Sequence, residues 1–364
     1  MKVCHITTVH RRDDSRIFRK QCISLSQRAV ETCLIVADGL GDETVEGVNI
    51  LDIGFIPGRI SRFLKSIGRI RKLIKDLDAD IFQIHDPELM PLALTLRVQG
   101  RIVIYDIHEN MHLQILTKKW IPLFLRKVCS SFYYYFERRL VLPWLSGALV
   151  PQPSMEREYL KYNSKVIRVA NFVSPTDHIK EKIDNRDLSN CRVFHPGSLT
   201  DERGLQNMIN FVDNSIKSHL DVNLTLAGRS NRMIDSTSIK YLGIISDLQT
   251  ISEHYLESNV GLILYNNVGQ YYLSYAIKLF EYLNFGLPVI MPNFGEWVEF
   301  NEKYNVGICV DVSDSESIIN EISSLLDDHI RYKVISENNY LLARKVFSWE
   351  GEADKLVSFY KDLI

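Results

Sequence analysis

The sequence predicts an α/β fold in which two domains are each built on a parallel sheet. Short buried-strand patterns alternate with longer amphipathic helix patterns along the whole chain, and parallel strands require such helical crossovers. The chain has 364 residues, which suits two domains of ordinary size. A hydrophobic fraction of 46% and a charged fraction of 24% are typical of a globular protein.

The first domain is expected to span 1–170. Its strands are predicted at 2–7, 32–36, 81–84, 102–105 and 148–150, where runs of aliphatic and aromatic residues are bounded by turn formers. Helices are predicted between them, where apolar residues recur at three and four positions, at 16–27, 60–75, 89–98 and 123–140.

The second domain is expected to span 171–346, after a polar stretch at 174–189. Its predicted strands are 192–195, 223–227, 239–242, 260–264, 289–292 and 308–310. Its predicted helices are 205–218, 248–257, 315–327 and 329–346. A separate helix at 349–363, with Ser348 placed to cap it, is expected to form the third segment, 347–364.

The cysteines and the amino terminus predict a cytoplasmic protein. Six cysteines are scattered without a CxxC pair or a Cys/His cluster, so we expect buried thiols in a reducing compartment. The chain starts directly with a strand pattern and lacks a signal-peptide core. No apolar run approaches the roughly 20 residues that span a bilayer.

Charge is distributed unevenly between the two halves. Residues 1–180 hold 27 Lys and Arg against 19 Asp and Glu, whereas the remainder holds 16 against 26. The segments 59–75 and 118–139 combine cations with apolar or aromatic residues, so they are candidates for contact with an anionic membrane surface. The alternative is that both are ordinary crossover helices with solvated cations. No nucleic-acid-binding motif is present, and no nucleic-acid partner is expected.

The segment 274–291 is the most informative of the chain. Ser274 is expected to cap a short helix whose buried stripe includes Ile277, Phe280 and Leu283, and a buried strand follows. Lys278 and Glu281 stand three apart on this helix and therefore share a face. A cation at a helix start suits a phosphate, and a carboxylate one turn later can accept hydrogen bonds from a ribose. A solvated surface ion pair is the alternative.

This segment resembles the nucleotide-sugar signature of family 4 glycosyltransferases, in the subgroup that reads Ser-x-Pro-x-Lys-Leu-Phe-Glu-Tyr followed by Gly-x-Pro-Val-Ile. The chain has Ala276 in place of the proline. The resemblance implies the GT-B fold, with two facing Rossmann-like domains, the site in the cleft and a final helix that crosses back onto the first domain. It also implies sugar transfer with retention from a nucleotide-sugar, expected to be a UDP-sugar, onto a glycan or a polyprenyl-diphosphate-linked glycan. Synthesis of capsule, exopolysaccharide or O-antigen is the expected setting.

A second motif, at 195–204, resembles the family's Gly-Arg-Leu…Lys-Gly loop that clamps the donor diphosphate. Gly197 lets the backbone approach a ligand, and Arg203 matches the second cation of the family. Ser198 replaces the first cation, and Lys278 is expected to compensate. Arg203 and Lys278, together with His108 of the first domain, are therefore the expected catalytic residues.

The remaining donor-site residues also follow from the resemblance. Glu281 matches the glutamate that binds the ribose, whereas Leu273 stands where the family has a second glutamate for the hexose. Gly228 and Ile244 lie in two strand-end turns like those around the nucleobase. With Gly197, Ser198, Arg203, Ser274 and Lys278 they complete the predicted donor-binding set.

Polar residues that follow three strands of the first domain are the candidate acceptor site. His108 and Glu109 follow one strand, and His85 and Asp86 follow another, at the sheet edge where ligands of open α/β folds bind. His108 resembles the family's strand-end histidine near the transferred sugar. His10 and Asp14 follow the first strand and match a subgroup that reads His-x-x-Asp-Asp-x-Arg-Ile-Phe. A purely structural pairing of Asp14 with Arg16 is the alternative for that loop.

Other classes of protein fit less well. The Asp-x-Asp spacing at 76–80 lies between a helix and a strand, so no metal site and no essential metal are expected. No Gly-x-Gly-x-x-Gly follows the first strand, which argues against an oxidoreductase. Two alternatives stay open: a sugar-nucleotide epimerase of the same architecture, and a non-catalytic nucleotide-sugar-binding subunit, which Ser198 and Leu273 would explain.

Overall fold

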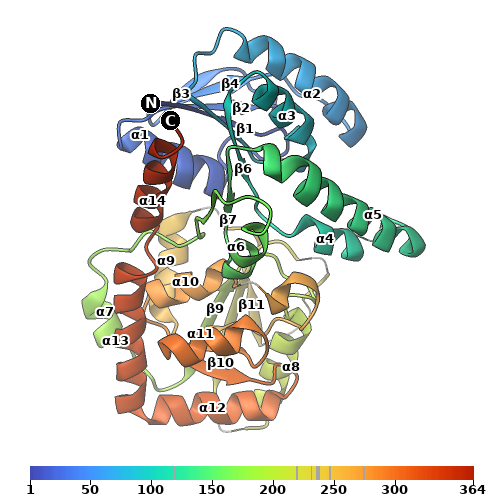
Figure 1. Ribbon diagram of the computed structural model, residues 1–364. Helices are drawn as coiled ribbons and strands as arrows, with labels where there is room; N and C mark the ends of the chain where they lie inside the picture. Colours follow the sequence, from blue (N-terminus) through green and yellow to red (C-terminus); the bar gives the residue numbers. More distant parts are fainter. Residues whose placement is uncertain (119, 219, 231, 235–237, 246, 274) are drawn as a thin grey trace. The chain divides into compact units, whose positions relative to one another are not determined.

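A computed structural model of the chain describes residues 1–118, 120–218, 220–230, 232–234, 238–245, 247–273 and 275–364 (Figure 1). The chain forms two compact units. The first unit holds Met1–Asn171 and Trp349–Ile364, and the second holds Phe172–Ser348.

The first unit is built on one eight-stranded sheet in the order β3-β4-β2-β1-β5-β6-β7-β8. All neighbouring strands are parallel except β3 and β4, which form a hairpin. The central strand β1 pairs on both sides, with Val3 opposite Thr32 and Ile81. The strands are β1 (Lys2–Ile6), β2 (Glu31–Val36), β3 (Glu43–Val45), β4 (Val48–Asp52), β5 (Ile81–Ile84), β6 (Ile102–Asp106), β7 (Gly147–Val150) and β8 (Val166–Arg168).

Helices cover both faces of this sheet (Figure 1). They are α1 (Ile23–Gln27), α2 (Arg59–Ile74), α3 (Met90–Val98), α4 (Met111–Thr117), α5 (Leu123–Tyr135), α6 (Pro153–Tyr159) and α14 (Trp349–Lys361). Wider π-type turns form Ser15–Cys22 and Phe136–Val141, and short 3₁₀ turns form Pro87–Leu89 and Leu142–Trp144. The predicted helices at 16–27 and 123–140 therefore each combine an α-helix with π-type turns.

The final helix α14 belongs to the first unit. Its buried residues Trp349, Leu356, Phe359 and Tyr360 pack in one apolar cluster with residues of β1, β5, β6 and β7. The return of the chain's end to the first domain, which the resemblance implied, is thereby observed. The hairpin β3–β4 was not predicted, because Glu43 and Thr44 are exposed and supply no apolar alternation.

The second unit contains two three-stranded parallel sheets, β11-β10-β9 and β12-β13-β14. The strands are β9 (Cys191–Pro196), β10 (Val222–Ala227), β11 (Ile239–Tyr241), β12 (Gly261–Leu262), β13 (Val289–Pro292) and β14 (Gly307–Val310). The sheets meet at β9 and β12, where the Asn259 N–H donates to the Arg192 carbonyl at 2.9 Å and the Tyr282 hydroxyl contacts the carbonyls of Phe194 and Leu262. The strand order is that of a Rossmann fold, with its reversal between β9 and β12.

The helices of the second unit are α7 (Lys180–Asp184), α8 (Leu205–Ser215), α9 (Leu248–Glu257), α10 (Ile277–Asn284), α11 (Glu296–Tyr304), α12 (Ser315–Asp327) and α13 (His329–Lys345). A 3₁₀ turn spans Gly269–Tyr272. Helix α11 was not predicted, because its nine residues bury few side chains, among them Trp297 and Phe300. The predicted strand 260–264 is only two residues long as β12.

The topology of each unit marks where a ligand would bind. In open parallel sheets a crevice forms outside the carboxyl ends of the strands where the strand order reverses. That point lies between β1 and β5 in the first unit and between β9 and β12 in the second. The residues that follow these four strands are therefore the first candidates for function.

The Trp349 side chain should anchor α14. It is 3% exposed, and its indole Nε1 donates to Ser24 Oγ at 2.7 Å. Trp349→Ala should lower the free energy of unfolding by about 3–5 kcal/mol, because it leaves a cavity and removes this hydrogen bond. Chemical denaturation measures the change. Lys361→Ala, at an exposed position of the same helix, should stay within about 0.5 kcal/mol of wild type, and equal stability of both variants would refute the anchoring role.

Candidate functional site

Helix α10 carries a buried cation in the second unit. The Lys278 side chain is only 6% exposed, although lysine is rarely buried without a partner. Burial lowers its pKa to about 8, and the nearby Arg203 also lowers it, while Glu281 acts in the opposite direction. These effects show that the charges of Arg203 and Glu281 act on the Lys278 ammonium.

The start of α10 differs from the prediction. The helix begins at Ile277 with Ala276 as its N-cap residue, whereas the sequence placed the cap at Ser274, which lies outside the described residues. Ile277 was expected in the buried stripe but is 41% exposed, while Phe280 and Leu283 are buried as predicted. At the start of the helix, Lys278 and not Ile277 therefore occupies a buried position.

Two glycine turns after β9 and β10 bring the backbone beneath this lysine. Gly197 and Gly228 have φ values of 126° and 125°, which favour glycine. A Cβ on Gly228 would lie 2.0 Å from the Gly197 carbonyl oxygen, and one on Gly197 would lie 2.5 Å from Lys278 Nζ. Both positions must therefore be free of side chains, and the lysine ammonium lies directly against the turn that follows β9.

Arg203 lies at the entry to α8. Its Nε donates to the Tyr271 hydroxyl at 3.2 Å, and its side chain is half-buried. Gly204 follows with φ 76° as the N-cap residue, and a Cβ there would lie 1.9 Å from the Leu264 carbonyl oxygen. The close approach of α8 to the end of β12 thus fixes the position of the backbone that carries the Arg203 side chain.

Glu281 has a partner that the sequence did not identify. Its Oε2 accepts a hydrogen bond of 2.6 Å from the hydroxyl of Tyr255, which is 2% exposed on α9. Burial, then the charge of Glu281, raises the pKa of Tyr255 well above its ordinary value, so Tyr255 remains a donor. Nothing in the sequence linked Tyr255 to Glu281, because the pair joins two helices.

His195 is a further buried group at the end of β9. Its Nδ1 lies 2.9 Å from the Leu262 carbonyl, which can only accept, so Nδ1 carries the proton. Its Nε2 is buried and has no partner in the part of the chain that the structure describes. Burial, then the charges of Lys278 and Arg203, lowers the pKa of His195 well below its ordinary value, so the ring is neutral.

Two residues of the predicted donor set are less constrained. Ser198 is exposed after β9, and Ile244 is 70% exposed beyond β11. Within the part of the chain that the structure describes, neither side chain has a contact that would define a role. Their assignment to donor binding stays a prediction.

The first unit brings together five of its candidate residues at the strand-order reversal. His10 follows β1, and its ring lies 3.4 Å from Asp14 and 3.5 Å from Asp86 through Nδ1 and Nε2 respectively. His85 follows β5, and its Nδ1 lies 3.2 Å from Nε2 of His108, which follows β6. Glu109 is exposed, and no hydrogen bond or ion pair of its side chain is formed within the described ranges.

His10 is held near two carboxylates. Burial alone would lower its pKa, but the contact with Asp14 and the charges of Asp86, Asp14 and Asp106 raise the pKa of His10 above its ordinary value. Asp86 is itself fixed by hydrogen bonds from Thr7 and the Thr8 backbone. His10 therefore favours its charged form more than an isolated histidine does.

A buried ion pair that was not predicted lies beneath these residues. Arg16 donates to both oxygens of Asp106, from Nη2 to Oδ1 at 2.6 Å and from Nε to Oδ2 at 3.0 Å. Burial would raise the pKa of Asp106, but Arg16, then His108 and His85, hold it well below the ordinary range. The alternative of a side-chain ion pair between Arg16 and Asp14 is wrong. The Asp14 carboxylate instead accepts hydrogen bonds from the backbone N–H groups of Arg16 and Ile17.

The structure also bears on where a metal could bind. Among the described residues, His85, Asp106 and His108 place one ligand atom each within 4.8 Å of the others. The Asp-x-Asp segment lies in an exposed loop, where Asp80 Oδ2 accepts the Lys2 backbone N–H at 2.7 Å. Asp80 therefore has a structural role between β1 and β5.

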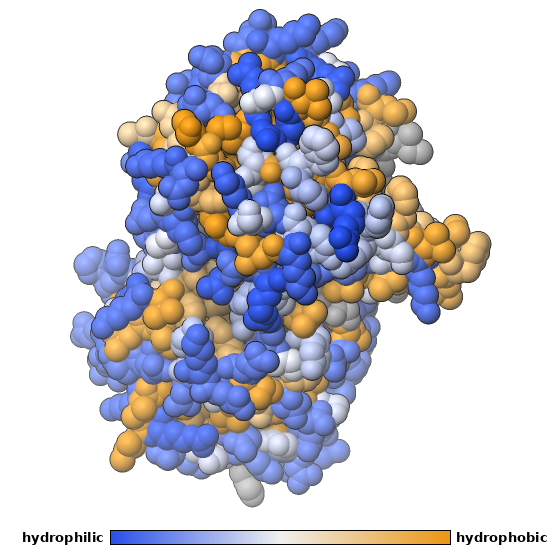
Figure 2. Space-filling model, viewed as in Figure 1, coloured by the Kyte–Doolittle hydropathy of each residue, from blue (hydrophilic) through white to orange (hydrophobic). Residues whose placement is uncertain are grey.

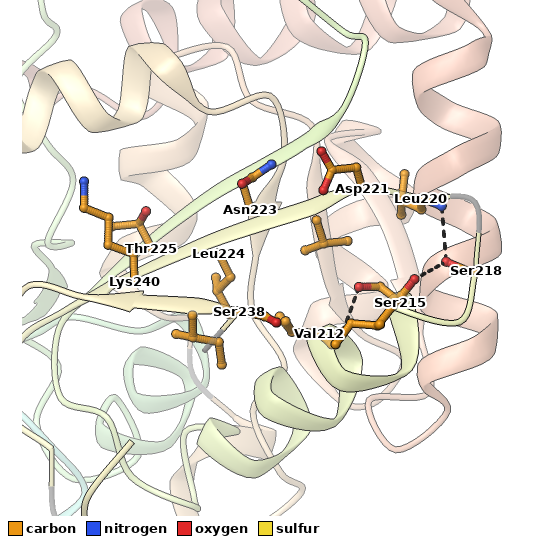
Figure 3. Close-up of a pocket in the computed structure, with 13 residues that line it drawn as sticks. Val212, Ser215, Ser218, Leu220, Asp221, Asn223, Leu224, Thr225, Ser238 and Lys240 are labelled. Carbon is orange, nitrogen blue, oxygen red and sulfur yellow. Dashed lines mark hydrogen bonds between the residues drawn. The ribbon is translucent and has the colours of Figure 1, made fainter. Parts of the chain in front are cut away.

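A pocket of about 790 Å³ lies elsewhere in the second unit (Figure 3). It is lined by the end of α8, the first four residues of β10 and the region around β11. None of Gly197, Arg203, Lys278 and Glu281 lines it. The convergence of strand ends, cations and a carboxylate, not the volume of this pocket, identifies the candidate site.

The buried Lys278 should destabilise the second unit. In the unfolded chain the lysine has a pKa near 10.5, and the difference from about 8 corresponds to about 3 kcal/mol. Below pH 8 the unfolded state holds the proton more tightly, so Lys278→Met should raise the free energy of unfolding by about 3 kcal/mol at pH 7. This gain should disappear as the pH rises from 8 to 10.5, which denaturation at several pH values measures. A variant that is less stable than wild type at pH 7 would contradict the assignment.

Comparisons with known proteins cover nearly the whole chain. Residues 3–177 match the family model described as Glycosyltransferase Family 4, and residues 178–342 match the model described as Glycosyl transferases group 1. No curated protein matches the sequence significantly.

Solved structures share the fold at low sequence identity. Sucrose-phosphate synthase from Thermosynechococcus elongatus is 14% identical with a TM-score of 0.75, over 100% of this chain and 98% of that one. HepE from Anabaena, in complex with UDP and glucose, is 11% identical with a TM-score of 0.69, over 99% of both chains. An E. coli structure described as trehalose-6-phosphate bound with UDP-2-fluoro glucose is 11% identical with a TM-score of 0.71, over 100% of both chains.

These matches confirm the predicted fold class and the predicted kind of enzyme. The two family models follow one another along the chain and together span both units. The Rossmann-like topology of the second unit and the parallel sheet of the first agree with the architecture of the similar structures. The chain is therefore a glycosyltransferase of the GT-B type.

Proposed function

We propose that the second unit binds a UDP-sugar and that the enzyme transfers its sugar, with retention of configuration, to a glycan or polyprenyl-diphosphate-linked glycan of a bacterial surface polysaccharide. The observation that carries the proposal is the buried Lys278 ammonium against the Gly197 turn, with the charges of Arg203 and Glu281 acting on it. A cation is kept in such a site at a cost in stability, which is typical of a functional group.

The donor diphosphate would lie against the turn after β9. Exposed backbone at Gly197 admits a phosphate closely, and Lys278 and Arg203 supply two positive charges. Lys278 thereby replaces the charge that Ser198 lacks. With both charges supplied by side chains, we propose that donor binding requires no metal ion.

The ribose would bind to Glu281. One carboxylate oxygen accepts from Tyr255, which orients the group and leaves the other oxygen for the ribose hydroxyls. Uridine is proposed as the base because two of the structures that share the fold are described with UDP or a UDP-sugar. Gly228, Ile244 and Ser274 complete the proposed donor set.

Transfer would depend on stabilising the departing diphosphate. Charge develops on the leaving group in the transition state, and fixed cations in a desolvated site act on it most strongly. Arg203 and Lys278 have this role in our proposal. His108, with His10, Asp14, His85, Asp86 and Glu109, would orient the acceptor at the strand ends of the first unit.

Helix α5 offers a surface for a lipid-linked acceptor. Leu123, Phe124, Val128 and Phe132 are each more than 60% exposed, and Arg126 and Lys127 accompany them. Figure 2 shows apolar side chains gathered where α4 and α5 project from the sheet of the first unit. We propose that this apolar surface, within the segment 118–139, inserts into the interface of an anionic membrane. Among the described residues no helix is both long and apolar enough to cross a bilayer.

Helix α2 has a different character. Ile70 and Ile74 pack in the core below the sheet, and Arg69, Arg71 and Lys72 are exposed. The second half of the helix therefore supports the first unit, whereas Phe63 and Leu64 in its first half are 43% and 69% exposed. The cations of 59–75 would add only long-range attraction to an anionic surface.

Donor recognition can be tested by calorimetry without added metal. Wild-type protein should bind UDP more tightly than GDP or ADP, and should bind 2′-deoxy-UDP at least about tenfold more weakly, because a charged hydrogen bond is lost. Glu281→Gln should weaken UDP binding and should no longer distinguish the two uridine nucleotides.

The matched control for that experiment is Glu302→Gln, at an exposed position of α11 in the same unit. It should bind UDP as wild type does. Undiminished discrimination between UDP and 2′-deoxy-UDP in Glu281→Gln would refute the ribose contact. Binding of no nucleoside diphosphate by the wild type would refute the proposed donor.

Membrane association can be tested by co-sedimentation with vesicles that contain phosphatidylglycerol. The double variant Phe124→Ser/Phe132→Ser should bind at least about tenfold more weakly, because each buried phenylalanine contributes about 1.5–3 kcal/mol. Ile330→Ser/Val334→Ser, at exposed positions of α13, is the control and should bind as wild type does. Equal binding by both double variants would show that α5 is not the contact surface.

A further inference from the structure

Three atoms of the first unit form a nearly equilateral triangle. His85 Nδ1 lies 3.2 Å from His108 Nε2, and each of these nitrogens lies 3.2 Å from Asp106 Oδ2. Atoms at this spacing can all lie about 2.1 Å from one common point, which is the usual distance of imidazole nitrogen and carboxylate oxygen from Zn²⁺. We propose that His85, Asp106 and His108 form a binding site for a divalent transition-metal ion.

The surrounding residues suit the three ligands. His85 Nε2 lies 3.0 Å from His5 Nδ1, so it can donate its proton there and leave Nδ1 for the metal. Asp106 is oriented by Arg16, whose Nη2 donates to Oδ1, and by Gln21, whose Nε2 donates to Oδ2 at 2.8 Å. Outer hydrogen bonds of this kind hold metal ligands in place and select the ring tautomer.

The charges nearby are largely paired. Asp14, Asp86 and Asp106 lie in or beside the cluster, where Arg16 binds Asp106 and the His10 ring contacts Asp14 and Asp86. A metal ion is therefore supported by the geometry of the three ligand atoms and not by a surplus of negative charge.

Of the three ligand side chains, one is partly exposed to solvent. The side chains of His85 and Asp106 are fully buried, while that of His108 is 18% exposed. Three protein ligands leave a further coordination position on a zinc-like ion, as in sites that bind water or a substrate oxygen. The ligand set of two imidazoles and one carboxylate suits Zn²⁺ or Co²⁺ better than Mg²⁺.

The test is titration of the tag-free protein with Co²⁺, followed by visible absorption, and with Zn²⁺ by calorimetry. Wild-type protein should bind one ion per chain, and His85→Ala and His108→Ala should each abolish this binding. Gln21→Leu should weaken it by about 10- to 100-fold through the orientation of Asp106. His329→Ala, at an exposed position of α13, should bind as wild type does.

Either of two results would overturn the proposal. One is the absence of saturable one-to-one binding of both ions by the wild-type protein. The other is binding that persists in His108→Ala, which removes a partly exposed side chain and therefore remains informative if His85→Ala does not fold. Neither result depends on a nucleotide, so failure of this site is distinguishable from failure of the proposed donor binding.

Discussion

The buried ion pair between Arg16 and Asp106 holds together distant segments of the first unit. Arg16 donates to both oxygens of Asp106 and also, through Nη1, to the Val169 carbonyl at 3.0 Å and to Asn171 Oδ1 at 2.9 Å. One side chain thus joins the segment after β1, the end of β6 and the last residues of the unit before the chain leaves it. Removing one partner of such a pair typically costs about 3–5 kcal/mol, because the other charge stays buried.

This pair also determines what the candidate residues around it can do. Asp106 is kept ionised, so the two imidazoles that face it must supply a proton or share a cation. His10, farther out, is held by Asp14 and Asp86. The charged and polar side chains at this end of the sheet are therefore in contact with one another, and the charge of each affects its neighbours.

In the second unit the buried charge of interest is a cation. There a lysine is buried against bare backbone at Gly197, and burial, together with the charge of Arg203, lowers its pKa against the opposing effect of Glu281. An anionic ligand would balance the positive charge of the lysine. Without that ligand, a buried charge of this kind lowers the stability of the unit. The site of the second unit thus contains a buried cation, and the site of the first unit contains several carboxylates. Each lies where the strand order of its sheet reverses.

Most strands and helices of both units could be predicted from the amino-acid pattern, because buried strands and amphipathic helices each have a local period. The hairpin β3–β4 and helix α11 could not, because Glu43 and Thr44 are exposed and α11 buries few side chains. Gly197, Arg203, Lys278 and Glu281 were predicted as donor-site residues from the resemblance of two segments to the family's motifs, and their roles stay predictions. The burial of Lys278 depends on how the chain folds. So do the contact of Tyr255 with Glu281 and the contact of Arg16 with Asp106 instead of the Asp14 carboxylate. The partners in these two contacts stand 26 and 90 residues apart, so no local pattern could reveal them.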